Sequence, residues 1–231
     1  MKSFTSAVVL CACLGAAPAL AHVPTLTSAS DASWPDLGAF GNDGALTLDN
    51  QNTFLAIAGA AALSYYLSEH VFDDADDTLY FYTRNGVAHG FDIRMHSLSF
   101  GVENRLSPWF ALGGVGTYQW WEDSGALPSE DSGSGIGISA HARWYVLGEQ
   151  VISPFVEYGA GVFYGFEKFP HDGTHWTFNL SSQIGIEYQV SDTAVIRFGY
   201  GNAHQSNNGL SATNPGFDGN GFSLTYATQW K

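Results

Sequence analysis

Three side chains near the C-terminal end of this 231-residue chain could together carry out nucleophilic hydrolysis. His204 and Ser206 are two residues apart, and Asp218 follows fourteen residues after the histidine. If this segment is a β-strand, residues i and i+2 project from the same side, about 6.6 Å apart along the strand axis. The imidazole could then accept the serine proton while the carboxylate holds its other ring nitrogen. The spacing therefore predicts a serine–histidine–acid site, provided that the fold brings Asp218 beside His204.

The elements that must position these residues are strands, because the chain after residue 78 repeats with a period of two. In residues 174–190 the even positions are mainly apolar, whereas the odd positions are mainly polar. Residues 136–146, 154–166 and 222–230 repeat this pattern. Each segment is therefore predicted to be a strand with one apolar and one polar face.

Such alternation fits either a soluble sandwich, whose apolar face forms the core, or a membrane barrel, whose apolar face meets lipid. The strands are about ten residues or longer, which is the length that a tilted membrane strand needs. Aromatic residues lie at strand ends, as an interfacial girdle would require, at Trp109, Trp120, Trp121, Tyr145, Trp176 and Trp230. The polar faces carry charges of both signs at mid-strand, which could pair in a lumen, at Glu103, Arg105, Arg143, Glu157, Glu187 and Arg197. These features favour the barrel.

The connections predict how the strands are joined. We expect strands near residues 78–84, 92–105, 108–121, 134–147, 151–166, 174–190, 193–206 and 219–230. The links after the second, fourth and sixth strands are tight, and the others are longer, as in outer-membrane barrels. The predicted fold class is all-β: an eight-stranded antiparallel transmembrane up-and-down β-barrel with a short N-terminal helical or irregular segment. A barrel of this size has an interior filled by side chains.

Side-chain parity places the three candidate residues on the outside of this barrel. Arg197 suits the lumen, so His204 and Ser206 continue the lipid-facing row of Phe198. Asp218 shares parity with the apolar residues of the last strand, and antiparallel pairing would bring it beside His204. The three residues would lie at the outer end of the barrel, near the headgroup boundary. The other interpretation is that they are ordinary polar residues of an aqueous rim.

The N-terminal part divides into two predicted segments. Residues 1–21 are predicted to be a signal peptide, with Lys2 before an apolar run and Ala19-Leu20-Ala21 as the cleavage site. A lipoprotein signal at Cys13 is the weaker alternative. Residues 22–77 form a leader with a short helix at residues 54–67, although a strand there also fits. The barrel follows at residues 78–231. Export and a barrel together predict the outer membrane of a Gram-negative bacterium.

Two stretches resemble the lipid A 3-O-deacylase family of outer-membrane barrel hydrolases. One is His204-Gln205-Ser206-Asn207-Asn208-Gly209-Leu210 followed by Asn214-Pro215-Gly216-Phe217-Asp218, and the other is residues 154–162. The resemblance implies an eight-stranded barrel that hydrolyses the ester-linked acyl chain at the lipid A 3 position, with no metal and no cofactor. It implies His204 as base, Ser206 as nucleophile, Asp218 as acid and Asn207 as a candidate for oxyanion stabilisation. The family's acid is Glu, so the shorter Asp218 predicts a longer contact with His204 or a backbone shift.

Two other functions remain open at this stage. One is a phospholipase-like barrel hydrolase, and the other is a structural or adhesion barrel in which the His-x-Ser pattern is incidental. The expected partners are lipopolysaccharide, through its lipid A, and the lipids of the outer membrane; the sequence leaves a homodimer open. Nucleic acid is excluded as a partner, because the chain carries 22 Asp and Glu against 8 Lys and Arg, a formal net charge of −14.

Overall fold

The structure is a computed structural model that describes residues 51–71, 78–90, 93–123, 132–169, 173–207 and 216–230. One helix, α2 (Gln51–His70), precedes eight strands. The strands are β1 (Thr78–Gly90), β2 (Ile93–Ser107), β3 (Phe110–Asp123), β4 (Gly133–Tyr145), β5 (Ile152–Phe169), β6 (Thr174–Ser191), β7 (Ala194–Ser206) and β8 (Phe217–Gln229). The predicted signal peptide and residues 22–50 lie outside the described residues. The helix contains the predicted residues 54–67.

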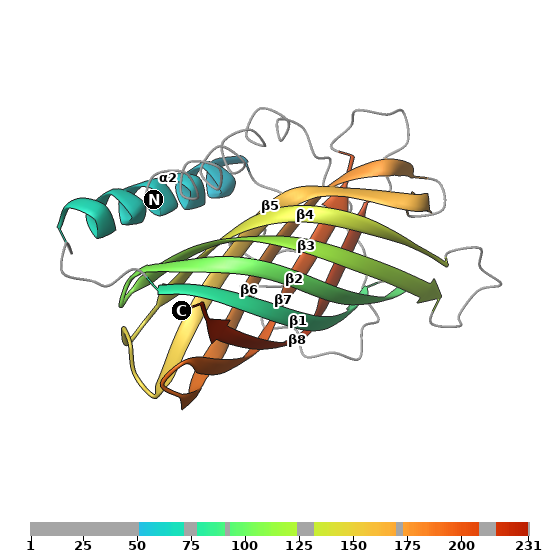
Figure 1. Cartoon of the computed structure of the whole chain (residues 1–231). Coiled ribbons are helices and arrows are strands. Elements are labelled where there is room, and N and C mark those ends of the chain that lie inside the picture. Colours follow the sequence, from blue (N-terminus) through green and yellow to red (C-terminus); the bar gives the residue numbers. More distant parts are fainter. Residues whose placement is uncertain are drawn as a thin grey trace.

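The strands form one closed barrel in which each strand pairs antiparallel with the next and β8 returns to β1 (Figure 1). This confirms the predicted all-β, eight-stranded up-and-down barrel. The connections after β2, β4 and β6 lie at the end where β1 begins and β8 ends, and those after β1, β3, β5 and β7 lie at the other end, called here the outer end. The prediction that the latter links are all longer is wrong, because β1 ends at Gly90 and β2 begins at Ile93, which makes that link as short as the one after β2. Strand β1 runs to Gly90, six residues beyond the prediction, because small residues such as Gly86 interrupt the apolar alternation there.

The middle of the lumen is filled by the predicted charges. Glu103 accepts hydrogen bonds from Arg143 and Arg197, the latter with an N–O distance of 2.7 Å, and lies 3.0 Å from His141 Nε2. Glu187 accepts from Arg197 at 2.6 Å and from Arg105 at 2.9 Å. Buried charges are costly unless each is paired, and in this network the carboxylates bridge the guanidinium groups. The prediction that both signs of charge pair inside the barrel is therefore confirmed.

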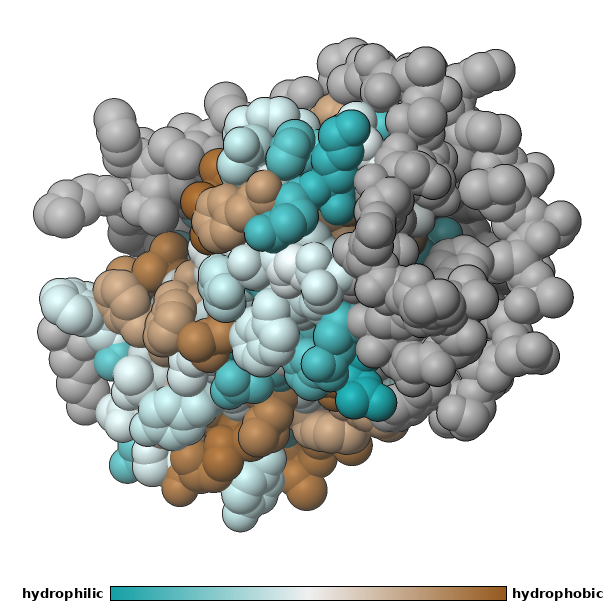
Figure 2. All heavy atoms as spheres, turned by 90° about the vertical axis from the view of Figure 1, so that its right-hand side faces the viewer, coloured by the Kyte–Doolittle hydropathy of each residue, from teal (hydrophilic) through white to brown (hydrophobic). Residues whose placement is uncertain are grey.

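The outer wall is apolar, as a lipid-facing surface requires. Its exposed side chains include Phe100, Ile138, Trp176, Ile186, Phe198 and Leu224. Seen from the outer end, hydrophobic residues gather along the lower and left edges of the barrel, and hydrophilic ones lie nearer the middle (Figure 2). Two members of the predicted aromatic girdle face inward instead. Trp121 packs inside the outer end, and the Tyr145 hydroxyl donates to Glu187, because both residues share the parity of the lumen.

Helix α2 lies against the outside of the barrel and crosses it from β2 and β3 toward β5 and β6 (Figure 1). Ala61 and Tyr65 pack in a cluster with Leu112 and Ala142 of the outer wall, and Trp144 Nε1 donates a hydrogen bond to Ser64 Oγ at 2.9 Å. Apolar side chains also cover the opposite side of the helix, which is exposed. Within the described ranges, α2 is the helix present, and it is not long and apolar enough to cross a membrane.

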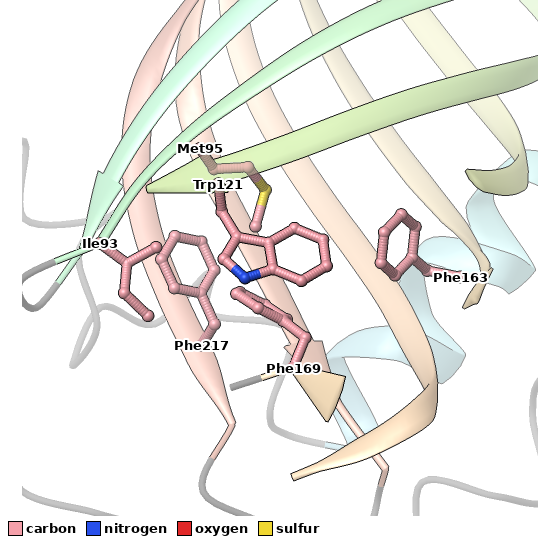
Figure 3. Packing of buried hydrophobic residues seen from close by; sticks show 6 residues of the cluster. All are labelled: Ile93, Met95, Trp121, Phe163, Phe169 and Phe217. Atoms are coloured by element: carbon pink, nitrogen blue, oxygen red, sulfur yellow. The ribbon is translucent and has the colours of Figure 1, made fainter. Parts of the chain in front are cut away.

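An apolar cluster fills the lumen at the outer end (Figure 3). Its members come from four strands and point toward one another: Ile93, Met95, Trp121, Phe163, Phe169 and Phe217. The rings of Trp121 and Phe169 are 4.6 Å apart, and those of Phe169 and Phe217 are 5.5 Å apart. The cluster therefore ties the outer ends of β2, β3, β5 and β8 together, next to the candidate site.

Candidate active site

His204 and Ser206 lie at the outer end of β7 and project from its lipid-facing side. The ring atom His204 Nε2 is 3.0 Å from Ser206 Oγ. The imidazole can bridge the two positions because alternate residues of a strand share one face. Both side chains are shielded, with 7% of His204 and 4% of Ser206 exposed. The pair is therefore preorganised for transfer of the serine proton to the ring.

Asp218 is the direct cross-strand partner of His204 on β8, and its Oδ1 lies 2.7 Å from His204 Nδ1. The register between β7 and β8 continues without a bulge through this pair. Of the two expectations for the shorter aspartate, the longer contact with His204 is thus wrong. Direct pairing brings the two backbones close enough for the shorter side chain to reach. With Nδ1–H donating to the carboxylate, Nε2 is left as the acceptor for the Ser206 hydroxyl.

The inward-facing neighbours of these residues hold the two strand ends in place. Gln205 lies between His204 and Ser206, and its Nε2 donates to Gln119 Oε1 at 2.7 Å inside the barrel. Phe217 precedes Asp218 and is fully buried in the apolar cluster (Figure 3). Because inward and outward side chains alternate, anchoring these neighbours fixes the direction in which the site residues project.

Gly90, at the end of β1, allows the backbone of Asp218 to approach closely. A Cβ atom at position 90 would lie 1.8 Å from the carbonyl oxygen of Asp218. No side chain fits into that space unless one strand moves. The acid is thus positioned from both sides, by its pairing with β7 and by the glycine on β1.

Asn207 directly follows β7 and is also buried, with 4% exposed. It lies one residue from the serine, within the described part of the chain. Residues 208–215, which carry the rest of the sequence pattern up to Gly216, lie outside the described residues.

The wall below the site is apolar on both strands. Phe222 of β8 packs against Tyr200 of β7 with ring centroids 4.8 Å apart, and it stacks on Phe198 at 5.5 Å. Phe198 and Leu224 are about half exposed. All of these residues share the parity of His204 or Asp218, as predicted. The site therefore stands between an apolar wall and the outer rim.

Two features of the site's surroundings were missed by sequence reasoning. Helix α2 packs through Ile57 and Ala58 against Leu180, the cross-strand neighbour of His204 on β6. Asn202, two residues before His204, is also buried on the outer wall. In the sequence, only its parity with His204 indicates that it lies on the same face as the site. Within the described ranges, no group of three or more His, Cys, Asp or Glu side chains could hold a metal ion.

Residues 96–227, more than half of the chain, match the family model described as lipid A 3-O-deacylase (PagL). The crystal structure of the outer membrane enzyme PagL is similar, with 17% identity and a TM-score of 0.51 over 64% of this chain and 98% of that one. Neisserial surface protein A matches with 10% identity and a TM-score of 0.45, over 67% of this chain and 97% of that one. The N-terminal barrel of Pseudomonas aeruginosa OprF matches with 13% identity and a TM-score of 0.42, over 66% and 99%. A comparison with curated proteins gives no match.

Proposed function

Because this chain belongs to the lipid A 3-O-deacylase family, we propose that it removes the ester-linked acyl chain at the 3 position of lipid A by a serine–histidine–acid mechanism. The observation that carries this proposal is the continuous relay from Asp218 through His204 to Ser206, with contacts of 2.7 and 3.0 Å. These are the contacts that a hydroxyl nucleophile, its base and an orienting acid require.

In the proposed reaction, Ser206 Oγ attacks the ester carbonyl as His204 Nε2 takes its proton. The bond between Oγ and the carbonyl carbon forms, and negative charge gathers on the carbonyl oxygen. The bond from that carbon to the sugar oxygen then breaks, and the imidazolium returns the proton to the sugar oxygen. Asp218 stays ionised, holds the ring tautomer and stabilises the imidazolium. Water then cleaves the acyl-serine ester, again with His204 as base, and releases a fatty acid.

The proposed oxyanion stabiliser is Asn207. Its amide could donate to the charged oxygen of the tetrahedral intermediate, because it follows Ser206 immediately in the chain. A donor fixed in a buried position stabilises this charge more than mobile water does.

The position of the site supports an outer-leaflet lipid as substrate. The relay lies at the outer end of the wall, and the apolar faces of β7 and β8 continue below it. In such a lipid the ester lies between the sugars and the acyl chains. The ester would therefore lie level with Ser206 while the acyl chains contact residues such as Phe198 and Leu224.

The test is to produce the protein in a Gram-negative outer membrane and to analyse extracted lipid A by mass spectrometry. We expect the loss of one hydroxyacyl chain, which disappears in Ser206→Ala and in His204→Ala. Matched controls are Ser97→Ala in the lumen and His96→Ala on the outer face of β2, which should retain activity. The folded fraction is compared by heat-modifiable gel mobility.

Two results would contradict the proposal. The appearance of lysophospholipid with intact lipid A would favour a phospholipase-like hydrolase. No change in any lipid, with a folded barrel in the membrane, would favour a structural or adhesion role.

A further inference from the structure

A row of polar side chains crosses the lipid-facing wall one step into the membrane from His204. Its members are successive cross-strand partners on four neighbouring strands, Ser182 of β6, Asn202 of β7, Asn220 of β8 and His89 of β1. Each shares the parity of an exposed apolar residue of its own strand, at Ile186, Phe198, Leu224 and Phe81. Polar side chains are costly on a surface that faces lipid, so a continuous row of them indicates a function.

Asn202 holds an unused hydrogen-bond donor within this row. Its Nδ2 is buried and donates to no acceptor within the described part of the chain. The residue is 8% exposed, which is close to the 7% of His204 and the 4% of Ser206. A substrate that reaches the shielded nucleophile must open the same strand face, which also exposes this amide. A ligand oxygen that accepts from Nδ2 then removes the cost of a buried donor without a partner.

The depth of Asn202 determines which part of a substrate can supply that oxygen. Asn202 lies about 6.6 Å from His204 along the strand axis, on the side toward the middle of the membrane. A lipid whose ester carbonyl is bound at Ser206 has its sugar and phosphate oxygens on the opposite side, toward water. An oxygen at the depth of Asn202 therefore belongs to the acyl chain.

The strand spacing also limits how far that oxygen is from the ester. The Cα atoms of Ser206 and Asn202 are about 13 Å apart along the strand. The Ser206 hydroxyl already leans toward His204, with 3.0 Å between Oγ and Nε2. When the reach of the two side chains and a hydrogen bond of about 3 Å are subtracted, only a few carbon atoms of chain remain between the ester and the oxygen. A hydroxyl group near the carboxyl end of the acyl chain meets this requirement.

We propose that Asn202 is a specificity-determining residue, whose side-chain amide donates a hydrogen bond to a hydroxyl group near the carboxyl end of the acyl chain that is removed. The site therefore prefers hydroxyacyl esters to plain acyl esters. This inference rests on the proposed function. Asn202 takes no part in proton transfer, and its neutral amide makes this bond without placing a charge in the apolar wall. Ser182 and Asn220 flank it on both sides, so the bound hydroxyl lies within a polar strip.

The test compares two synthetic lipid A molecules whose 3-position chain is either 3-hydroxytetradecanoyl or tetradecanoyl. We expect the wild type to cleave the hydroxylated chain with a kcat/KM about tenfold higher, the effect of one neutral hydrogen bond. In Asn202→Leu the ratio of the two kcat/KM values should fall to about one. This ratio is independent of the folded fraction, because both substrates are measured on the same preparation. The matched control is Asn85→Leu, at an exposed asparagine on the outward face of β1 outside the row, which should keep the wild-type ratio.

The other outcomes separate the role of Asn202 from the chemistry. If the wild type cleaves both substrates equally well, or if Asn202→Leu keeps the preference, the role of Asn202 is overturned and the proposed function stands. If Asn202→Leu slows both substrates by the same factor, the role is again overturned, because Asn202 then acts through His204 and not through the acyl chain. If the wild type cleaves neither chain while the barrel is folded, the proposed function fails, and the role of Asn202 fails with it.

Discussion

His204 and Asp218 face each other across β7 and β8 as a direct cross-strand pair, with Nδ1 and Oδ1 2.7 Å apart. About a third of the Asp218 side chain remains exposed, whereas the histidine is buried. The carboxylate is therefore in contact with water, while the ring that it orients is shielded. With this pair, the contact between His204 and Ser206 extends to a continuous series of contacts from Asp218 through His204 to Ser206.

The acid position is tested by Asp218→Asn. The amide cannot stabilise the imidazolium and can hold the wrong ring tautomer, so we expect kcat to fall by about 10²- to 10⁴-fold with the barrel still folded. Asp218→Glu should recover much of the rate, since it restores the charge. The measurement is the rate of acyl release from purified lipid A in detergent. Full activity of the asparagine variant would remove Asp218 from the mechanism.

Because Gly90 lies so close to the backbone of Asp218, a side chain at position 90 should displace the acid. Gly90→Ala forces the backbone of Asp218 to move, since the new Cβ atom would otherwise lie 1.8 Å from its carbonyl oxygen. We expect about a 10²-fold loss of kcat, the size of effect that a misplacement of about 1 Å produces. Gly116→Ala is the control, because its Cβ atom would make only an ordinary van der Waals contact, 3.9 Å from the Phe100 carbonyl oxygen. Equal activity of the two variants would show that this contact does not position the acid.

The apolar cluster at the outer end predicts that stability and activity are coupled there. Phe217→Ala removes a fully buried ring, so the free energy of unfolding should fall by about 3–5 kcal/mol, and kcat should fall with it because Asp218 is adjacent. Urea unfolding in detergent, followed by tryptophan fluorescence, measures the first effect. Phe198→Ala, on the exposed wall, should cost much less stability. A Phe217→Ala variant as stable as the wild type would contradict the anchoring role.

Breaking the charge network in the lumen should lower the free energy of unfolding and leave kcat unchanged. Glu103→Gln leaves Arg143 and Arg197 without a shared carboxylate, and breaking a buried pair costs about 3–5 kcal/mol. The comparison is Glu122→Gln, whose 3.4 Å pair with Arg94 is half exposed and contributes less than about 1 kcal/mol. Unfolding in urea gives both values. Because Glu103 faces the lumen, the folded variant should keep its kcat; a large drop in kcat would show that the network also supports the site.

Much of the barrel could be predicted because its pattern is local. Alternation assigns a side to each residue of a strand from its immediate neighbours, so Arg197 inward and His204 outward follow from parity alone. The expectation of an aromatic girdle failed at Trp121 and Tyr145. Their position at strand ends suggested contact with lipid, but their parity is that of the lumen, where Trp121 packs in the apolar cluster and Tyr145 donates to Glu187.

The sequence by itself determined the strands, the mixed charges of the lumen and the placing of His204 and Ser206 on one outer face, because these depend on neighbours along the chain. Only the tertiary structure decided that Asp218 reaches His204, since that contact depends on the register between two strands and on the gap left by Gly90. It also decided the position of α2. Apolar residues surround that helix on all sides, so no stripe in its sequence specifies a partner, and its site is set by small residues on distant strands.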